Sequence, residues 1–248
     1  MAATTTPPSS SPHAPVRPGQ PVVVPVAAAT GPVDYAGAFD AYWSAGDRLS
    51  AGEPASISML AHQVLVTCGP GRLLDVGCGR GSLVRELLTR GVDAHGVDVS
   101  QRVVEHAAAR TPGRFAAASV LALPYADGAF DTVTAINCLE HLAEADLPRA
   151  LAEIARVARR GVFVTVATKP ETDGRAFGIA RPREWWEQKL IEAGLRKHPA
   201  APGILPYESL ERQDGDATLV MEKLPAEAAA SHPLESLREQ RGLHMDML

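Results

Sequence analysis

The sequence predicts an α/β protein: a doubly wound, mostly parallel sheet with helices on both of its faces. Two observations carry this prediction. Strand-like apolar runs alternate with helix-like segments over residues 71–224, and such alternation is typical of a parallel sheet covered on both faces by its crossovers. A glycine cluster, "LDVGCGRG", also joins the first of these strands to the first helix, where doubly wound folds bind nucleotide-like ligands.

The expected elements follow one another along the chain. Residues 34–67 carry apolar residues at helical spacing and predict two helices, separated by Gly52 and Pro54. The expected strands are "GRLLDV" (71–76), "DAHGVDV" (93–99), "RFAAAS" (114–119), "FDTVTAI" (130–136), "VFVTVAT" (162–168) and "ATLVMEKL" (217–224). The expected helices between them are "SLVRELLTRG" (82–91), "SQRVVEHAAAR" (100–110), "DLPRALAEIARVARRG" (146–161) and "RPREWWEQKLIEAG" (181–194).

Helix ends are marked by capping residues. Ser100 and Asp146 are the expected N-caps, because their side chains can accept hydrogen bonds from the first turn. Gly91, Gly161 and Gly194 are expected just past the ends of their helices.

Two tails of different composition flank one folded domain of residues 34–224. Residues 1–33 are rich in proline, serine, threonine and alanine, a composition that predicts a disordered leader because it cannot bury a core. Residues 225–248 are rich in alanine and charge and are expected to form a flexible or helical tail.

Composition excludes several classes of function. The chain has 248 residues and a formal net charge of -5, so no general basic field favours a nucleic-acid partner. Its three cysteines fit neither a disulfide framework nor a metal-ligand spacing, so we expect no metal site and a reducing compartment. No apolar run is long enough to span a membrane. We therefore expect a cytoplasmic protein.

The glycine cluster has a structural and a functional interpretation. Gly77, Gly79 and Gly81 permit a tight turn, and they also let backbone N–H groups approach a ligand. Asp98 follows roughly 20 residues later at the end of the next strand, where a carboxylate binds ribose hydroxyls, although an aspartate there also forms turns. A dinucleotide loop is disfavoured, because Ser82 replaces its third glycine and the Asp75 carboxylate suits a cation better than a pyrophosphate.

Four motifs in order, "LLDVGCGRG", "GVDVS", "LALPYADGAFDTV" and "INCLEHL", resemble the class I S-adenosylmethionine-dependent methyltransferases, in particular the branch that includes ubiquinone-biosynthesis-type enzymes. The resemblance covers residues 71–166. It implies a Rossmann-like methyltransferase fold with seven strands, methyltransferase activity and S-adenosylmethionine as cofactor. The domain then divides into an N-terminal helical lid (34–68), a cofactor-binding core (71–168) and acceptor-side elements (169–224).

The resemblance also implies which residues hold the cofactor. The methionine part is expected beside Asp75, the ribose at Asp98, and the adenine at Ser119 and Val120, where Ser119 replaces the acidic residue that many family members carry. Asn137 is placed near the methyl donor, although an asparagine that ends a strand also satisfies loop backbone. The remaining expected cofactor contacts are Gly77, Cys78, Gly79, Gly81, Val99, Tyr42 and Trp43.

The acceptor and the chemistry are tied to two further stretches. His141 in "NCLEH" is the candidate general base for an alcohol acceptor, and the alternative is a packing residue at a helix start. Glu140 would orient His141 or the substrate. "RPREWWEQ" offers the expected substrate-binding residues Arg181, Arg183, Trp185 and Trp186, since arginine binds anionic groups and indole stacks on sugars or flat rings. A solvated helix start is the alternative.

The predicted function is therefore O-methylation of a hydroxyl on a small molecule or glycan in a biosynthetic pathway. One alternative is a non-catalytic interaction module with the same fold, and another is an N- or C-methyltransferase of a small molecule. An NAD-dependent oxidoreductase is disfavoured by Ser82 and Asp75.

Overall fold

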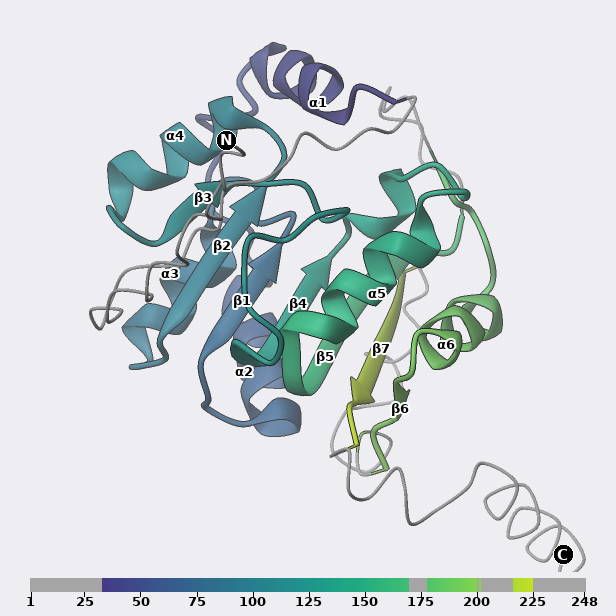
Figure 1. The fold of residues 1–248 in the computed structure, drawn as a ribbon. Helices are drawn as coiled ribbons and strands as arrows, with labels where there is room; N and C mark the ends of the chain where they lie inside the picture. The colour runs from purple at the N-terminus through teal and green to yellow at the C-terminus, as the bar shows by residue number, and fades with distance from the viewer. Residues whose placement is uncertain (1–32, 170–177, 200, 202–215, 225–248) are drawn as a thin grey trace, which may run out of the picture.

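A seven-stranded sheet in the order β3-β2-β1-β4-β5-β7-β6 forms the centre of the protein (Figure 1). The computed structural model describes residues 33–169, 178–199, 201 and 216–224. The strands are β1 (Leu73–Val76), β2 (Ala94–Asp98), β3 (Phe115–Ala117), β4 (Phe130–Ile136), β5 (Ala158–Ala167), β6 (Arg196–Lys197) and β7 (Asp216–Glu222). β1 to β5 are parallel, whereas β7 runs antiparallel to β5 and to β6. The expected fold class is confirmed.

Helices cover both faces of the sheet. They are α1 (Tyr35–Ser44), α2 (Ile57–Cys68), α3 (Ser82–Thr89), α4 (Gln101–Arg110), α5 (Leu147–Val157) and α6 (Arg183–Glu192), with one 3₁₀ turn, η1 (Leu139–His141). Apolar side chains of α2 and α3 pack with Leu73 and Phe163 on one face, and those of α5 and α6 pack with Leu74 and Val162 on the other. Burial of these side chains supplies the main driving force for folding.

α1 differs from the other helices in its position. It lies above the carboxyl ends of β1 and β2, across the edge of the sheet, and packs against α4 (Figure 1). The leader up to residue 32 and the tail 225–248 expected from the sequence lie outside the described residues.

The helix predicted over residues 146–161 is too long. α5 ends at Val157, and β5 begins directly at Ala158, which pairs with Phe130 of β4. Arg159 and Arg160 both reach the carboxylate of Asp131. Local helix propensity at these positions is overridden by strand pairing and by this ion-pair cluster, so Gly161 lies within a strand and does not follow a helix end.

The two expected N-caps have different outcomes. The Ser100 side chain accepts a hydrogen bond from the backbone N–H of Val103 and caps α4 as predicted. Asp146 occupies the N-cap position of α5, but its side chain makes no capping hydrogen bond. It accepts a hydrogen bond from the Tyr35 hydroxyl of α1.

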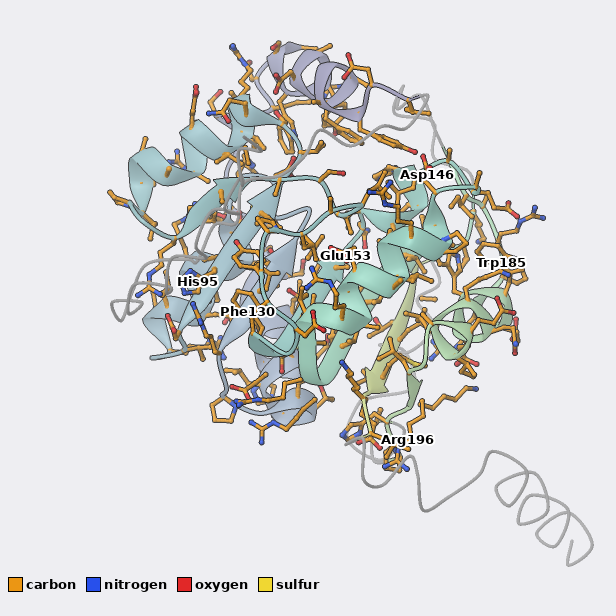
Figure 2. All side chains as sticks on the ribbon, in the orientation of Figure 1. His95, Phe130, Asp146, Glu153, Trp185 and Arg196 are labelled. Carbon is orange, nitrogen blue, oxygen red and sulfur yellow. The ribbon has the colours of Figure 1, made fainter. Side chains whose placement is uncertain are left out.

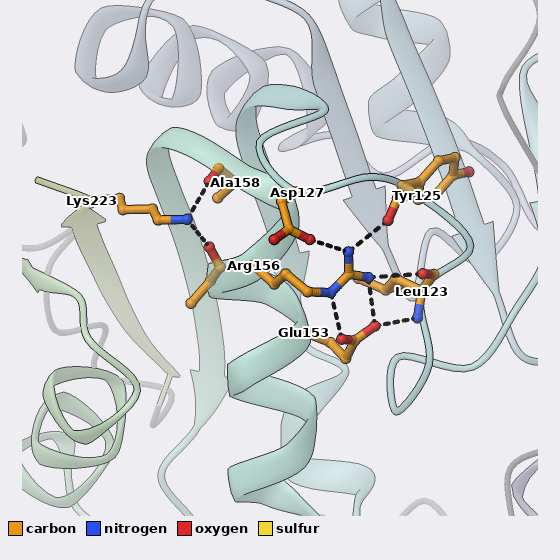
Figure 3. Close-up of polar contacts among 8 residues, drawn as sticks. Leu123, Tyr125, Asp127, Glu153, Arg156, Ala158 and Lys223 are labelled. Carbon is orange, nitrogen blue, oxygen red and sulfur yellow. Dashed lines mark hydrogen bonds and ion pairs between the residues drawn. The ribbon is translucent and has the colours of Figure 1, made fainter. Parts of the chain in front are cut away.

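The connection between β3 and β4 contains no helix. A network of ion pairs and hydrogen bonds around one arginine holds this connection in place (Figure 3). Arg156 of α5 donates hydrogen bonds to the carbonyl oxygens of Tyr125 at 2.7 Å and Leu123 at 3.0 Å. The same guanidinium pairs with Asp127 and Glu153, and Glu153 accepts a hydrogen bond from the Leu123 N–H. This connection therefore has a defined path, and it begins with two of the expected cofactor contacts.

Candidate functional site

The loop after β1 is shaped by a close approach to the loop after β4. Gly77 has φ +68°, and a Cβ at this position would lie 2.5 Å from the Cβ of Cys138. Gly79, at φ +51°, faces the indole of Trp43, whose Cζ2 would lie 3.3 Å from an added Cβ. Both positions combine a positive φ with little room, so a side chain at either one is disfavoured.

Asp98 connects this loop to the end of β2. Its carboxylate accepts hydrogen bonds from the N–H groups of Gly79 at 2.9 Å and Ser100 at 3.0 Å. Burial raises the pKa of Asp98, although these backbone donors oppose the rise. The backbone N–H of Val99 acts on the same carboxylate. A carboxylate has about four acceptor positions, so at least one remains for a ligand. Asp98 thus orders the loop and retains the capacity to bind a hydroxyl group.

Asp75 is a second buried carboxyl group, 3% exposed in β1. It lies between Gly96 of β2 and Thr134 of β4, and the Thr134 hydroxyl donates a hydrogen bond to its Oδ1 at 2.7 Å. Burial raises the pKa of Asp75 to about 7, the Thr134 hydrogen bond opposes the rise, and the nearby Asp98 adds to it. A cationic ligand beside Asp75 would favour the ionised form.

A cavity of about 300 Å³ lies at the carboxyl ends of β1, β2 and β4, beneath α1. Its size is at the lower end of the range for small-molecule sites. Of the expected cofactor contacts, the following line it: Tyr42, Trp43, Asp75, Gly77, Cys78, Gly79, Asp98, Val99, Ser119, Val120 and Asn137. His141 lines it as well. Gly81 does not, and it packs with Phe115 of β3 and Ala107 of α4.

Asn137 follows β4 in a left-handed conformation, at φ 48°, which is unusual for a residue other than glycine. Its side chain bonds to Thr165 of β5, which donates to the amide oxygen, and to Asp216 of β7, which accepts from the amide nitrogen at 3.4 Å. This residue therefore fixes the loop after β4 and also contributes to the cavity wall.

Ser119 and Val120 begin the connection between β3 and β4. The hydroxyl oxygen of Ser119 accepts a hydrogen bond from the Leu121 N–H at 3.2 Å. Ser119, Val120 and the neighbouring Val99 all line the cavity. In this part of the cavity wall, Ser119 is polar, and Val99 and Val120 are apolar.

His141 ends η1 and is 4% exposed. Its ring lies 6.1 Å, centroid to centroid, from that of Phe39 of α1. Glu140, next to it, points elsewhere: Oε1 accepts a hydrogen bond from the Ala167 N–H at 3.1 Å, and its backbone carbonyl accepts one from the Ile179 N–H. Glu140 joins η1 to the end of β5 and is absent from the cavity wall.

The other expected substrate-binding residues also lie outside the cavity. Both tryptophans belong to α6: Trp186 is fully buried in the core, and Trp185 lies well separated from α1 in Figure 2. Arg181 pairs with Glu144, and Arg183 with Glu187. Both arginines thus have carboxylate partners already.

Sequence reasoning missed several residues that line the cavity. Tyr35 and Phe39 come from α1, whereas Ile57 and Leu60 come from α2. The spacing of Tyr35, Phe39, Tyr42 and Trp43, at i, i+4, i+7 and i+8, places these aromatic side chains on one helix face and could have found the first two.

Metal and membrane features are not found in the part of the chain that the structure describes. No group of three or more His, Cys, Asp or Glu side chains is arranged there to hold a metal ion. None of the described helices is both long and apolar enough to cross a membrane. The three cysteines, Cys68, Cys78 and Cys138, are free thiols.

Comparison with known proteins gives consistent similarities. Residues 73–161 match the family model described as "Methyltransferase domain". Magnesium-protoporphyrin O-methyltransferase of Rhodobacter capsulatus is 30% identical over 159 residues, which cover 62% of this chain and 66% of that protein. 27-O-demethylrifamycin SV methyltransferase of Amycolatopsis mediterranei is 28% identical over 186 residues, 71% of this chain and 66% of that protein. The chain therefore spans less than two thirds of the length of these relatives.

Solved structures share the fold. Magnesium protoporphyrin IX methyltransferase of Synechocystis, determined with bound S-adenosylmethionine, gives a TM-score of 0.56 at 19% identity, over 77% of this chain and 98% of that one. A structure described as the [4+2]-cyclase SpnF gives a TM-score of 0.51 at 25% identity, over 67% of this chain and 81% of that one. Proteins with this fold therefore include one named for a different reaction, so the fold by itself does not assign the chemistry.

Proposed function

The chain belongs to the class I S-adenosylmethionine-dependent methyltransferases, and from this premise we propose that it transfers a methyl group to a hydroxyl of a small molecule or glycan in a biosynthetic pathway. One observation carries the proposal: two buried carboxyl groups, Asp75 and Asp98, face one cavity beside a glycine loop. A ligand that is cationic at one end and carries vicinal hydroxyls matches both groups. S-adenosylmethionine has these features.

The residues of the cavity fit this cofactor along its length. Asp98 would accept hydrogen bonds from the ribose hydroxyls, and Asp75 with the Gly77–Gly79 backbone would bind the methionine end. Val99, Ser119 and Val120 would hold the adenine. Asn137 would lie near the sulfonium, with Tyr42 and Trp43 of the N-terminal lid above it.

The cofactor supplies an activated methyl group on a sulfonium. The protein contributes alignment of the acceptor and exclusion of water, and here α1 closes one side of the cavity with aromatic side chains. For a hydroxyl acceptor, a ring nitrogen of His141 would take the proton, since His141 is the described histidine that lines the cavity. The placement of Arg181 and Arg183 outside the cavity favours a neutral acceptor over an acidic one.

We also propose that the protein acts in the cytoplasm. Free thiols at all three cysteines are consistent with the reducing conditions there. We assign no nucleic-acid partner, because the chain has a net charge of -5. Residues 169–224 remain the proposed acceptor-side elements, and within them residues 170–177, 200 and 202–215 lie outside the described part of the chain.

Ligand binding separates the proposal from its alternatives. We expect S-adenosylhomocysteine to raise the melting temperature of the full chain and NAD to leave it unchanged. The exposed-site variant Asp47→Asn should respond like the wild type, and Asp98→Asn should respond less. Stabilisation by NAD alone would contradict the cofactor assignment.

Catalysis is tested by transfer of labelled methyl groups from S-adenosylmethionine into small-molecule and glycan fractions of a cell extract. A methyl ether in the product, identified by mass spectrometry, supports O-methylation. A labelled amine or carbon supports an N- or C-methyltransferase. Binding without transfer into any fraction supports the non-catalytic module.

A further inference from the structure

Four aromatic side chains on α1, those of Tyr35, Phe39, Tyr42 and Trp43, line the cavity from one helix face. Tyr35 differs because it is 6% exposed and its hydroxyl has two partners in a distant part of the chain.

The Tyr35 hydroxyl joins α1 to the turn between η1 and α5. Its oxygen accepts a hydrogen bond from the Ala143 N–H at 2.8 Å, and its proton goes to Asp146 Oδ2 at 2.7 Å. Burial raises the pKa of Tyr35 to about 12, so the hydroxyl keeps its proton at neutral pH. Asp146 makes no capping bond to α5 and serves as the acceptor of this hydrogen bond.

The turn that Tyr35 binds begins directly after His141. Leu142 separates His141 from Ala143, so a bond to the Ala143 N–H restrains the backbone two residues from the imidazole. Phe39, one helical turn after Tyr35, lies beside the His141 ring. His141 is thus linked to α1 in two ways. Its ring lies beside that of Phe39, and the turn that follows it is hydrogen-bonded to the Tyr35 hydroxyl.

We propose that Tyr35 is a positioning residue, whose hydroxyl fixes the Leu142–Asp146 turn to α1 and thereby sets the place of His141 in the cavity. This inference rests on the proposed function, in which His141 takes the proton of the acceptor. It adds a consequence: the placement of His141 depends on α1, because the Tyr35 hydroxyl joins the turn after His141 to this helix.

Other contacts keep α1 attached when this hydroxyl is removed. The Asp40 carboxylate accepts hydrogen bonds from the Ser100 hydroxyl and, at 3.2 Å, from the Arg102 N–H at the start of α4. Arg80 of the glycine loop donates to the carbonyl oxygens of Ala51 and Gly52, in the segment after α1. Tyr35→Phe should therefore have a local effect, and its ring packing is retained.

The test compares Tyr35→Phe with Tyr125→Phe, which removes the hydroxyl of another buried tyrosine outside the cavity. Asp146→Ala removes the acceptor, whereas Asp146→Asn keeps an amide oxygen that accepts the same hydrogen bond. Three quantities are measured for each full-length variant. Calorimetry gives the affinity for S-adenosylhomocysteine, and hydrogen exchange compares peptides from α1 with peptides from residues 139–146. The ring signals of ¹³C-labelled histidine report on His141, whose signal is assigned by its loss in His141→Gln.

Tyr35→Phe and Asp146→Ala should shift the His141 signal and accelerate exchange in residues 139–146 by roughly five- to tenfold, the effect of one lost hydrogen bond. Exchange in α1 should change less than twofold. Asp146→Asn and Tyr125→Phe should match the wild type at His141. The double variant Tyr35→Phe/Asp146→Ala should add little to either single one.

An unchanged His141 signal in Tyr35→Phe would overturn the inference. Equal acceleration of exchange in α1 and in residues 139–146 would also overturn it, because Tyr35 would then act only in general stability. Failure of the wild type to bind S-adenosylhomocysteine would instead contradict the proposed function. The exchange and histidine measurements on the ligand-free protein would still decide whether Tyr35 positions His141.

Discussion

Asp75→Asn is expected to stabilise the ligand-free protein and to weaken cofactor binding. Burial of Asp75 raises its pKa from 3.8 to about 7. A carboxyl group with a raised pKa in the folded state contributes stability only while it is protonated. That contribution is complete below about pH 4 and is lost as the pH rises to about 7. Asparagine cannot ionise, so it removes this penalty, and its amide oxygen can still accept the Thr134 hydrogen bond.

The step from 3.8 to about 7 corresponds to about 4 kcal/mol at ~1.4 kcal/mol per pKa unit. This is an upper bound, because asparagine must bury two N–H donors where a carboxylic acid has one O–H. We expect the free energy of unfolding of Asp75→Asn to exceed that of the wild type by roughly 1–3 kcal/mol at pH 8, and by less at pH 5. S-adenosylmethionine should bind the variant more weakly, because a neutral amide attracts its cationic groups less.

Urea denaturation at pH 5, 6.5 and 8 measures this difference for the wild type and the variant. Asp47→Asn, the same substitution at an exposed position, is the matched control and should stay within about 0.5 kcal/mol of the wild type at each pH. A stability difference between Asp75→Asn and the wild type that does not depend on pH would refute the reasoning. A less stable variant at pH 8 would refute it as well.

Four further predictions follow from the site. Asp98→Asn should weaken S-adenosylhomocysteine binding by about 1.5–3 kcal/mol, measured by calorimetry, since a charge-assisted hydrogen bond is lost; unchanged affinity would remove Asp98 from the ribose site. Gly77→Ala should lower the free energy of unfolding more than Gly128→Ala does, because both have a positive φ but only Gly77 lies against Cys138; equal losses in chemical denaturation would show that the loops can separate. His141→Gln should reduce methyl transfer by about 10²–10⁴-fold with little change in cofactor affinity, and near-normal turnover would exclude it as the base. A chelator should leave methyl transfer unchanged, because no metal-ligand group occurs among the described residues; activity lost on chelation and restored by magnesium would contradict this.

Most elements of the sheet were predictable because they follow from local patterns. The strand "FDTVTAI" was located to the residue as β4, Phe130–Ile136, because β-branched residues and a buried alternation mark it. The cap at Ser100 follows from its side-chain chemistry. The glycine loop and Asp98 were paired from their positions at two strand ends, and they do meet: Gly79 donates to Asp98 at 2.9 Å.

Errors arose where distant residues decide the outcome. The segment Ala158–Gly161 continues a helical pattern, and only its pairing with β4 and the nearby Asp131 makes it a strand. The β6 strand was not expected, since two residues carry no periodicity. The ion pair of Arg181 with Glu144, 37 residues away along the chain, was not predictable, because it depends on how the segments pack; Arg181 stays a predicted substrate-binding residue.

The sequence by itself determined the alternating α/β fold, the glycine loop and the two carboxylates at strand ends, because period, propensity and strand order act over a few residues to a few tens of residues. The tertiary structure decided how these parts work as a site. It raised the pKa of Asp75 by burying it between two strands. It also brought Tyr35 to Asp146, 111 residues away along the chain. Burial and contacts between distant residues depend on how whole elements pack, and no local pattern carries that information.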